Sequence, residues 1–425
     1  MQNVISKILS LPEGYEPPYD CNNGAWLFLY RNKAKADMDY YVAEALSMGY
    51  TVFDETSFGE NYYTTMVKDG FCLHVYYTSH DASLRIIGDG FTQLYDAKMP
   101  DVEQRCPTTL WQFEVDHTLI DCGMCYIIRC CDNSFFIVDS AHPYSINDDE
   151  RIYNFLRKNT PDGEKIKVAG WFFSHAHEDH VGKFCDILRY KSDIEIEALY
   201  YNFISTEHRD SHNWMDSGKN FQRMYERLFE EHSEIKKIKL HSGQHFFVRN
   251  LEFRVLCTHE DVYPNSNLNY NDSSTMLIMN ACGSTVQFPG DAGHEESDIV
   301  CPRFGKLLRC DIMQAAHHGH LGTKTEFYEL SDAKTILFPT TQIKYDEEFE
   351  KIDVNRHAVD IADECFIASN GTMEFNLPYK VGEAIHHNDE TFEDFDGIFN
   401  LWAYTYTDER KQELRDLFIK NGGKL

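Results

Sequence analysis

One short segment of the chain concentrates side chains that bind metal ions. The motif SHAHEDHVG directly follows the apolar run AGWFF (169–173), which has the composition of a buried strand. Within six positions it supplies His175, His177, Asp179 and His180, and imidazole and carboxylate are common ligands of zinc-like cations. A turn from a strand into a helix directs several side chains toward one point. We therefore expect a strand, a turn and a helix here, with ligands for one or two adjacent ions.

The composition limits the kinds of protein that this chain can be. It has 425 residues, of which 42% are hydrophobic, so it can bury a large core. No run of about 18 apolar residues occurs, which argues against a membrane-spanning helix. The first residues contain too short an apolar stretch for a secretory signal. Thirteen cysteines at irregular spacing then favour reduced thiols and a cytoplasmic location.

The charge balance argues against a nucleic-acid substrate. Lys and Arg number 40 against 69 Asp and Glu, for a formal net charge of −29. Proteins that bind DNA or RNA gain much of their affinity from basic side chains that neutralise phosphates. We therefore expect a small-molecule substrate, with solubility as the simplest role of the excess acid.

Residues 1–103 have the pattern of a small α+β domain. Residues 33–48 show helical spacing of apolar side chains, and three runs rich in β-branched and aromatic residues follow at 50–56, 61–78 and 82–90. This segment contains no cluster of catalytic residue types. We predict a domain boundary at residue 103, inside a stretch with the composition of a linker, and the role of this first domain stays open.

Residues 104–425 alternate between predicted strands and helices. Such alternation indicates an α/β layered core rather than an all-helical or all-strand fold. The segment 408–421 is rich in charged residues and is predicted to form a helical tail. We expect residues 104–425 to form one α/β domain that ends in this tail, and the sequence is also compatible with a homo-oligomer.

Several motifs resemble those of the metallo-β-lactamase superfamily. HAHEDH matches the H-x-H-x-D-H signature of that superfamily, QFPGDAG resembles its strand-end Gly-Asp, and MQAAHHGH resembles a His-His-Gly segment. NDSSTMLIM resembles the stretch that precedes the Gly-Asp in one branch. That branch includes the hydrolase-like domain of DNA-uptake competence proteins and bacterial phosphorylcholine esterases. The likeness covers residues 108–378 and implies an αββα sandwich with a one- or two-metal site at one edge of the sheets.

The resemblance implies a role for each histidine and aspartate of the first motif. His175 and His177 would bind the first metal ion, and Asp179 and His180 would bind the second. Asp291, in the Gly-Asp motif, would lie between the two ions.

One member of the His-His-Gly segment would complete the second site. Whether this is His317 or His318 depends on strand register, because successive side chains point in opposite directions. The other histidine would stand near the leaving group as a proton donor. We expect Asp179 and His318 to take part in catalysis as well as in metal binding.

The third ligand of the first metal departs from the better-known members of the superfamily. They carry a histidine about twenty residues before the bridging aspartate, where this chain has Asn271 and Asp272. We rank these two positions first and His259 second. An amide oxygen is a weaker zinc ligand than imidazole, so this site would hold its ion loosely or prefer a harder metal.

The expected function is that of a metal-dependent hydrolase. Two divalent ions, zinc in the first place and manganese or iron as alternatives, would activate water against a small ester, with phosphodiesters and phosphoesters favoured. A di-iron oxidoreductase on the same fold is one alternative, although those enzymes carry Glu where this chain has His177. The other alternative is a metal-binding module without catalytic activity.

Overall fold

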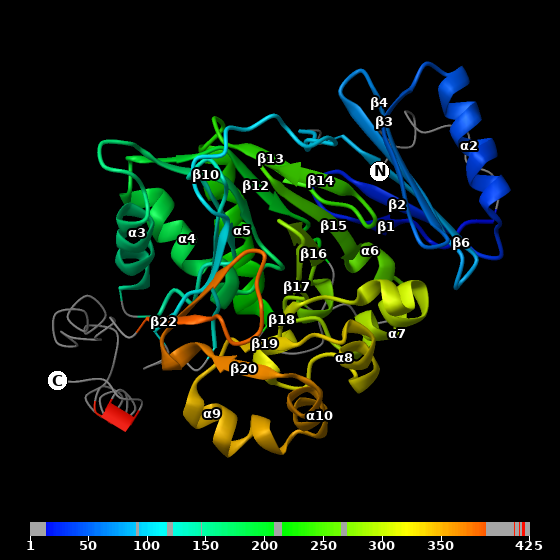
Figure 1. Cartoon of the computed structure of the whole chain (residues 1–425). Coiled ribbons are helices and arrows are strands. Elements are labelled where there is room, and N and C mark those ends of the chain that lie inside the picture. The colour runs from blue at the N-terminus through cyan, green and yellow to red at the C-terminus, as the bar shows by residue number, and fades with distance from the viewer. Residues whose placement is uncertain are drawn as a thin grey trace.

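The computed structural model describes residues 14–90, 93–116, 122–145, 147–207, 215–264 and 270–387, and single positions near the C-terminus. The predicted tail helix at 408–421 lies almost entirely outside these residues. The described chain forms three sheets with helices around them (Figure 1). No helix among the described residues is both long enough and apolar enough to cross a membrane.

Two of the sheets form the centre of the molecule. The nine-stranded sheet has the order β13-β12-β10-β9-β8-β7-β21-β22, with β11 beside β10. Its strands are β7 (Thr109–Gln112), β8 (Tyr126–Arg129), β9 (Phe135–Val138), β10 (Ile166–Phe172), β11 (Ile194–Ile196), β12 (Ala198–Tyr201), β13 (Lys236–Lys239), β21 (Thr372–Asn376) and β22 (Ile385–His387).

The seven-stranded sheet follows the chain order from β14 to β20. Its strands are β14 (His245–Val248), β15 (Leu251–Cys257), β16 (Met276–Ala281), β17 (Ser284–Phe288), β18 (Ile312–Gln314), β19 (Thr335–Phe338) and β20 (Glu364–Ile367). The first four are antiparallel neighbours, and β17 to β20 run parallel.

The two central sheets pack face to face through aromatic side chains. The rings of Phe136 and Phe253 lie 4.5 Å apart, and those of Tyr126 and Phe288 lie 5.5 Å apart. Strands buried on both faces must be apolar along their whole length, as FFIV in β9 and GWF at the end of β10 are. The space between the sheets is therefore a continuous apolar core.

Helices cover the outer faces of both sheets. On the nine-stranded sheet these are α3 (Asp148–Lys158), α4 (Glu178–Tyr190) and α5 (Met215–Glu231), whose apolar residues join the core around Trp171. On the seven-stranded sheet they include α7 (His294–Phe304), α8 (Thr325–Ser331) and α10 (Asp353–Ile361), while α9 (Gln342–Glu347) lies beside them (Figure 1). The predicted αββα sandwich is confirmed.

The first segment forms a third, antiparallel sheet with the order β1-β2-β6-β5-β4-β3. Its elements are β1 (Tyr19–Asp20), β2 (Trp26–Tyr30), α2 (Lys35–Ser47), β3 (Thr51–Phe58), β4 (Asn61–Lys68), β5 (Phe71–Thr78) and β6 (Ser83–Asp89). α2 covers one face, while Tyr63, Tyr76 and Ile87 join the sandwich core (Figure 1). The domain boundary at residue 103 stays a prediction.

A buried polar network joins this sheet to the sandwich. His241 Nδ1 lies 2.8 Å from Glu260 Oε1, in the short helix α6 (His259–Val262), and its Nε2 lies 3.4 Å from Asp89 Oδ2 in β6. Next to it, Arg303 of α7 forms an ion pair of 2.8 Å with Asp261, and both side chains are buried. Burial alone would lower the pKa of His241, but Glu260 and Asp89 raise it to about 9.

This network should make stability depend on pH through His241. The raised pKa means that its contribution is fully present below the unfolded value of 6.5 and is lost as the pH rises through 9. We expect the free energy of unfolding of wild type to exceed that of His241→Gln by several kcal/mol at pH 6. The difference should shrink by about 3 kcal/mol by pH 9.5. Urea unfolding of both proteins across this range measures it, and a difference independent of pH would contradict the assignment.

Candidate metal centre

The first motif folds as the strand, turn and helix that its sequence predicts. β10 ends at Phe172, His175 lies in the turn, and α4 begins at Glu178 after His177. Asp179 and His180 then lie in the first helical turn. His175 and His180 are fully buried. A buried turn with this many polar groups needs partners for each of them.

Two further strand ends reach the same place. Asp291 follows β17 after Gly290, and a Cβ atom at Gly290 would lie 2.7 Å from Ser174 Cβ. The two sheets therefore approach too closely here for any side chain but hydrogen. His317 and His318 follow β18 in a 3-10 turn, η3 (Ala316–Gly319), both at positive φ, +50° and +58°. Non-glycine residues rarely adopt this conformation, and when they do it is often at functional sites.

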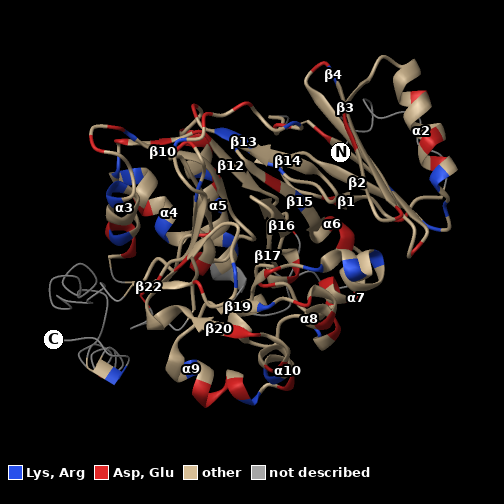
Figure 2. Cartoon of the chain, in the orientation of Figure 1, with Lys and Arg blue, Asp and Glu red and all other residues tan. Residues whose placement is uncertain are grey.

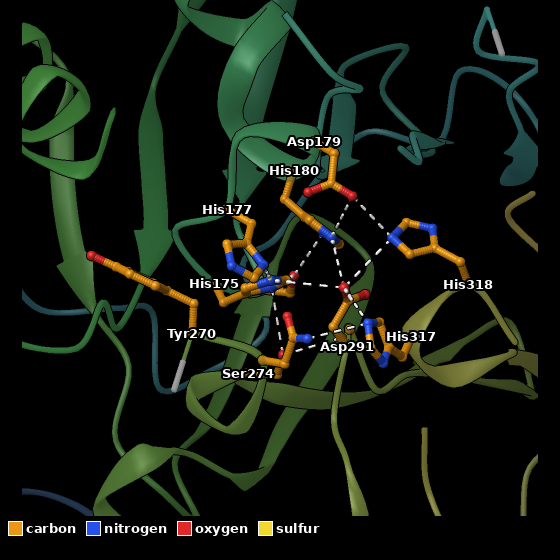
Figure 3. Close-up of polar contacts among 12 residues, drawn as sticks. His175, His177, Asp179, His180, Tyr270, Ser274, Asp291, His317 and His318 are labelled. Atoms are coloured by element: carbon orange, nitrogen blue, oxygen red, sulfur yellow. Dashed lines mark hydrogen bonds and ion pairs between the residues drawn. The ribbon is translucent and has the colours of Figure 1, made fainter. Parts of the chain in front are cut away.

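The side chains from these three places converge into two groups that share Asp291 (Figure 3). In the first group, ligand atoms of His175, His177 and Asp291 all lie within 4.8 Å of one another. In the second group, those of Asp179, His180, Asp291 and His318 do the same. Every member of both groups is buried.

The contacts inside the second group are close but are not hydrogen bonds of good geometry. His180 Nε2 lies 3.3 Å from Asp291 Oδ2, and His318 Nε2 lies 3.0 Å from Asp179 Oδ2 and 3.5 Å from Asp291 Oδ2. Neither Nε2 atom has a hydrogen-bond partner among the described residues, and neither has Asp291 Oδ1. Orphaned buried polar atoms are costly, so their convergence fits a cation held between them.

Hydrogen bonds outside the centre fix which ring nitrogen faces it. His180 Nδ1 lies 2.9 Å from Asp139 Oδ2, and His318 Nδ1 lies 2.9 Å from the carbonyl oxygen of Pro339. Both Nδ1 atoms must donate to these oxygens, which leaves the Nε2 atoms directed inward, where each offers a lone pair when its ring is neutral. Ser174 also donates to Asp139 through its backbone N–H and its hydroxyl, each at 2.9 Å. Such outer partners orient metal-binding histidines.

The pKa values in the second group show that its two carboxylates need positive charge beside them. Burial alone would raise the pKa values of Asp179 and Asp291, but His180 and its neighbours hold both well below the usual range. Conversely, burial alone would lower the pKa of His318, but Asp291 and Asp179 raise it to about 10. A bound cation would supply this positive charge and leave both imidazoles neutral, as ligands must be.

In the first group, the pKa values of the two histidines are lowered rather than raised. Burial lowers the pKa of His177 to about 4 and that of His175 well below its usual value. Their facing atoms, His175 Nε2 and His177 Nδ1, lie 2.9 Å apart. Both imidazoles are therefore neutral near pH 7, and a metal ion bound by both would replace the hydrogen bond between these two nitrogens.

Of the three candidates for the remaining ligand, only Asn271 lies beside the centre. In η1 (Asn271–Ser273), its Nδ2 lies 3.1 Å from His317 Nε2, and its Oδ1 is buried without a hydrogen-bond partner among the described residues. Asp272 lies instead beside Gly293, where α7 begins. His259 is wrong as a candidate, because its ring nitrogens contact Tyr19 and Asn202 beside the N-terminal sheet.

The structure also separates the two adjacent histidines. His318 is buried and belongs to the second group. His317 has a side chain 24% exposed, and its Nε2 lies 3.9 Å from Asp291 Oδ2. The left-handed turn at these residues, rather than strand register, directs both rings toward the same side of the chain.

One residue near the centre was missed in the sequence analysis. His142 lies between β9 and α3, is 7% exposed, and has Asp179 as the acidic group that most affects it. Burial lowers its pKa to about 4. Its position three residues beyond Asp139, the last residue of the strand-like run FFIVD, is the signal that would have drawn attention to it.

No protein-family model matches this sequence, and no curated protein matches it. Among solved structures, the chain is similar to the metallo-β-lactamase fold protein YhfI from Bacillus subtilis, at 12% identity and a TM-score of 0.37, over 62% of this chain and 97% of that one. It is also similar to CmlA, a diiron β-hydroxylase from Streptomyces venezuelae, at 13% identity and a TM-score of 0.36, over 65% and 55%.

A long form of RNase Z from yeast is a third similar structure, at 11% identity and a TM-score of 0.35. The similarity covers 68% of this chain and 44% of that one. Each is a protein that this chain resembles, and the αββα assignment depends on the sheet orders and core contacts described above.

Asp139 offers a test of the centre that leaves its inner groups intact. The Asp139→Asn variant keeps the shape of the side chain but removes the charge that the His180 Nδ1–H faces. We expect metal affinity to fall about tenfold to a hundredfold, as measured by competition with a chromophoric chelator. The same change at the exposed Asp311 serves as the control, and equal affinities in both variants would contradict the role assigned to Asp139.

Proposed function

We propose that this protein is a metal-dependent hydrolase that uses a pair of divalent cations to cleave a small ester. The observation that carries the proposal is the presence of two buried ligand groups that share one carboxylate, Asp291. A shared carboxylate between two nitrogen-rich groups is an arrangement that suits two adjacent cations. A single structural ion would not need both groups.

Each proposed cation has a defined set of protein ligands. His175, His177 and Asp291 would hold the first, with Asn271 Oδ1, which is buried without a hydrogen-bond partner among the described residues, as a candidate further donor. Asp179, His180, Asp291 and His318 would hold the second. When bound, the pair supplies a water of lowered pKa and polarises the substrate oxygen under attack.

The remaining chemistry belongs to side chains of the protein. Asp179 Oδ2 faces the centre from the first turn of α4 and is placed to accept a proton from the attacking water. Asn271 Nδ2 donates to His317 Nε2, so the proton of a neutral His317 ring resides on Nδ1. Because His318 Nε2 belongs to the second group, we assign His318 to metal binding. His317 faces Asp291 through an Nε2 atom that accepts from Asn271, so the neutral ring has no proton on this atom to give to a leaving group.

The donor set favours zinc, since imidazole and carboxylate are its usual ligands. The amide oxygen at the first site is a weaker zinc donor, so the first ion should exchange faster than the second, and manganese or iron remain alternatives to be measured. We propose a cytoplasmic location, since none of the thirteen cysteines forms a disulfide bond.

We propose a phosphodiester or phosphoester of modest size as the substrate. Paired cations have high affinity for phosphoryl oxygens. Outer helices such as α3 and α9 carry both acidic and basic residues (Figure 2), and the net charge of −29 opposes a polyanion such as DNA or RNA.

Metal analysis and an ester panel test this proposal together. We expect about two divalent ions per chain in wild type, and hydrolysis of at least one phosphoester. Both His177→Ala and Asp291→Ala should lower kcat/KM by at least about a thousandfold, because each removes a ligand of the cations that activate water. Asp298→Ala, a change to an exposed carboxylate on α7, is the matched control.

Other outcomes would assign the chain to a different class. Bound iron with oxygen consumption would indicate a di-iron oxidoreductase. Full metal occupancy without turnover of any ester would indicate a binding module. A metal-free protein that does not take up added zinc would overturn the hydrolase, the di-iron oxidoreductase and the binding-module assignments together.

A further inference from the structure

The segment that links β9 to α3 is held in an unusual conformation beside the metal centre. Asp139 and Ala141 have positive φ angles, +55° and +70°, within three consecutive residues. Neither is glycine, so this backbone costs free energy that the surrounding contacts must offset. Strain of this kind next to a catalytic centre suggests a functional position for a neighbouring side chain.

Contacts with α4 and the preceding loop hold the segment rigidly. Ser140 Oγ donates to the carbonyl oxygen of His180 at 3.1 Å, and Ala141 N donates to the carbonyl oxygen of Met124 at 3.0 Å. The ring of Pro143 lies against Gly182, where a Cβ would come within 2.3 Å of it. The Ser140 and Pro143 contacts therefore tie the segment to the helix that carries Asp179 and His180.

This anchoring presents His142 in a defined tautomer. Tyr144 N donates to His142 Nδ1 at 3.0 Å, so the proton of the neutral ring must reside on Nε2. That Nε2–H makes no hydrogen bond to any described residue. The ring of Tyr144 lies 5.0 Å from that of His142 and restricts its rotation. A Cβ atom on Gly123 would lie 3.2 Å from the backbone nitrogen of His142 and 3.7 Å from the carbonyl oxygen of Asp179, so His142 extends from backbone that lies beside the first turn of α4. His142 is thus an oriented hydrogen-bond donor next to the helical turn that carries Asp179.

We propose that His142 is a substrate-binding residue, whose Nε2–H donates to a phosphoryl oxygen of the ester. This inference rests on the proposed function, since it places the ester beside Asp179. A neutral donor is suited to this position, because it binds an anionic oxygen without adding a charge that would compete with metal binding. Preorganised donors directed at developing negative charge lower the barriers of such reactions.

Binding of inorganic phosphate to the full-length, metal-loaded protein tests the inference separately from turnover. We expect His142→Ala to weaken phosphate binding in calorimetry about tenfold to a hundredfold, with metal content unchanged. His142→Gln, whose side-chain amide can donate, should recover part of the loss. The control is His245→Ala, which changes a half-buried histidine of β14 that pairs with Glu252 of β15.

The outcomes separate this inference from the proposed function. Unchanged phosphate affinity in His142→Ala would overturn the inference, as would loss of metal from that variant or absence of phosphate binding in wild type. If phosphate binding depends on His142 but no ester is hydrolysed, the inference holds and the proposed function fails. Imidazole ¹⁵N shifts give a second measurement: a proton on Nδ1 rather than Nε2 of His142 would also overturn it.

Discussion

The confinement of two carboxylates in a buried pocket is the constraint on which the rest of the site depends. Asp179 Oδ2 and Asp291 Oδ2 lie 3.0 Å and 3.5 Å from the same atom, His318 Nε2. Both carboxylates are almost completely buried, and like charges this close repel strongly in a medium of low dielectric constant. The protein can keep both ionised only by surrounding them with positive charge. Without a metal ion, the imidazoles of His180 and His318 must supply it, and with one, they become ligands.

The fold explains why such a costly arrangement can persist. The two ligand-bearing turns follow β10 and β17, strands that are buried on both faces and paired within large sheets. Gly290 and Ser174 lie in contact across the interface of the two sheets, which fixes the distance between the turns. The free energy gained in the apolar core therefore offsets the electrostatic cost at its edge.

The sequence predicted the parts of this site that are local and missed those that depend on backbone geometry. The strand before His175 and the helix from Glu178 follow from apolar patterning, while the αββα layers were expected from the resemblance to the metallo-β-lactamase superfamily, and all of them are present. The choice between His317 and His318 could not be made from register, because both residues adopt positive φ angles that no spacing rule anticipates. His259 looked plausible in sequence, but its burial against the N-terminal sheet depends on contacts with Tyr19 and Asn202, far away in the chain.

The same long-range contacts change the interpretation of the first hundred residues. Their composition indicated a separate domain, and it did not predict a core shared with the sandwich. In the structure, β6 reaches α6 through Asp89, His241 and Glu260. α6 in turn contacts both η1, which carries Asn271, and α7, which begins three residues after Asp291. The N-terminal sheet therefore supports the two elements that bring Asn271 and Asp291 to the centre. A segment that supplies none of the proposed ligands can thus support the metal centre, because it holds in place the backbone from which the ligands extend.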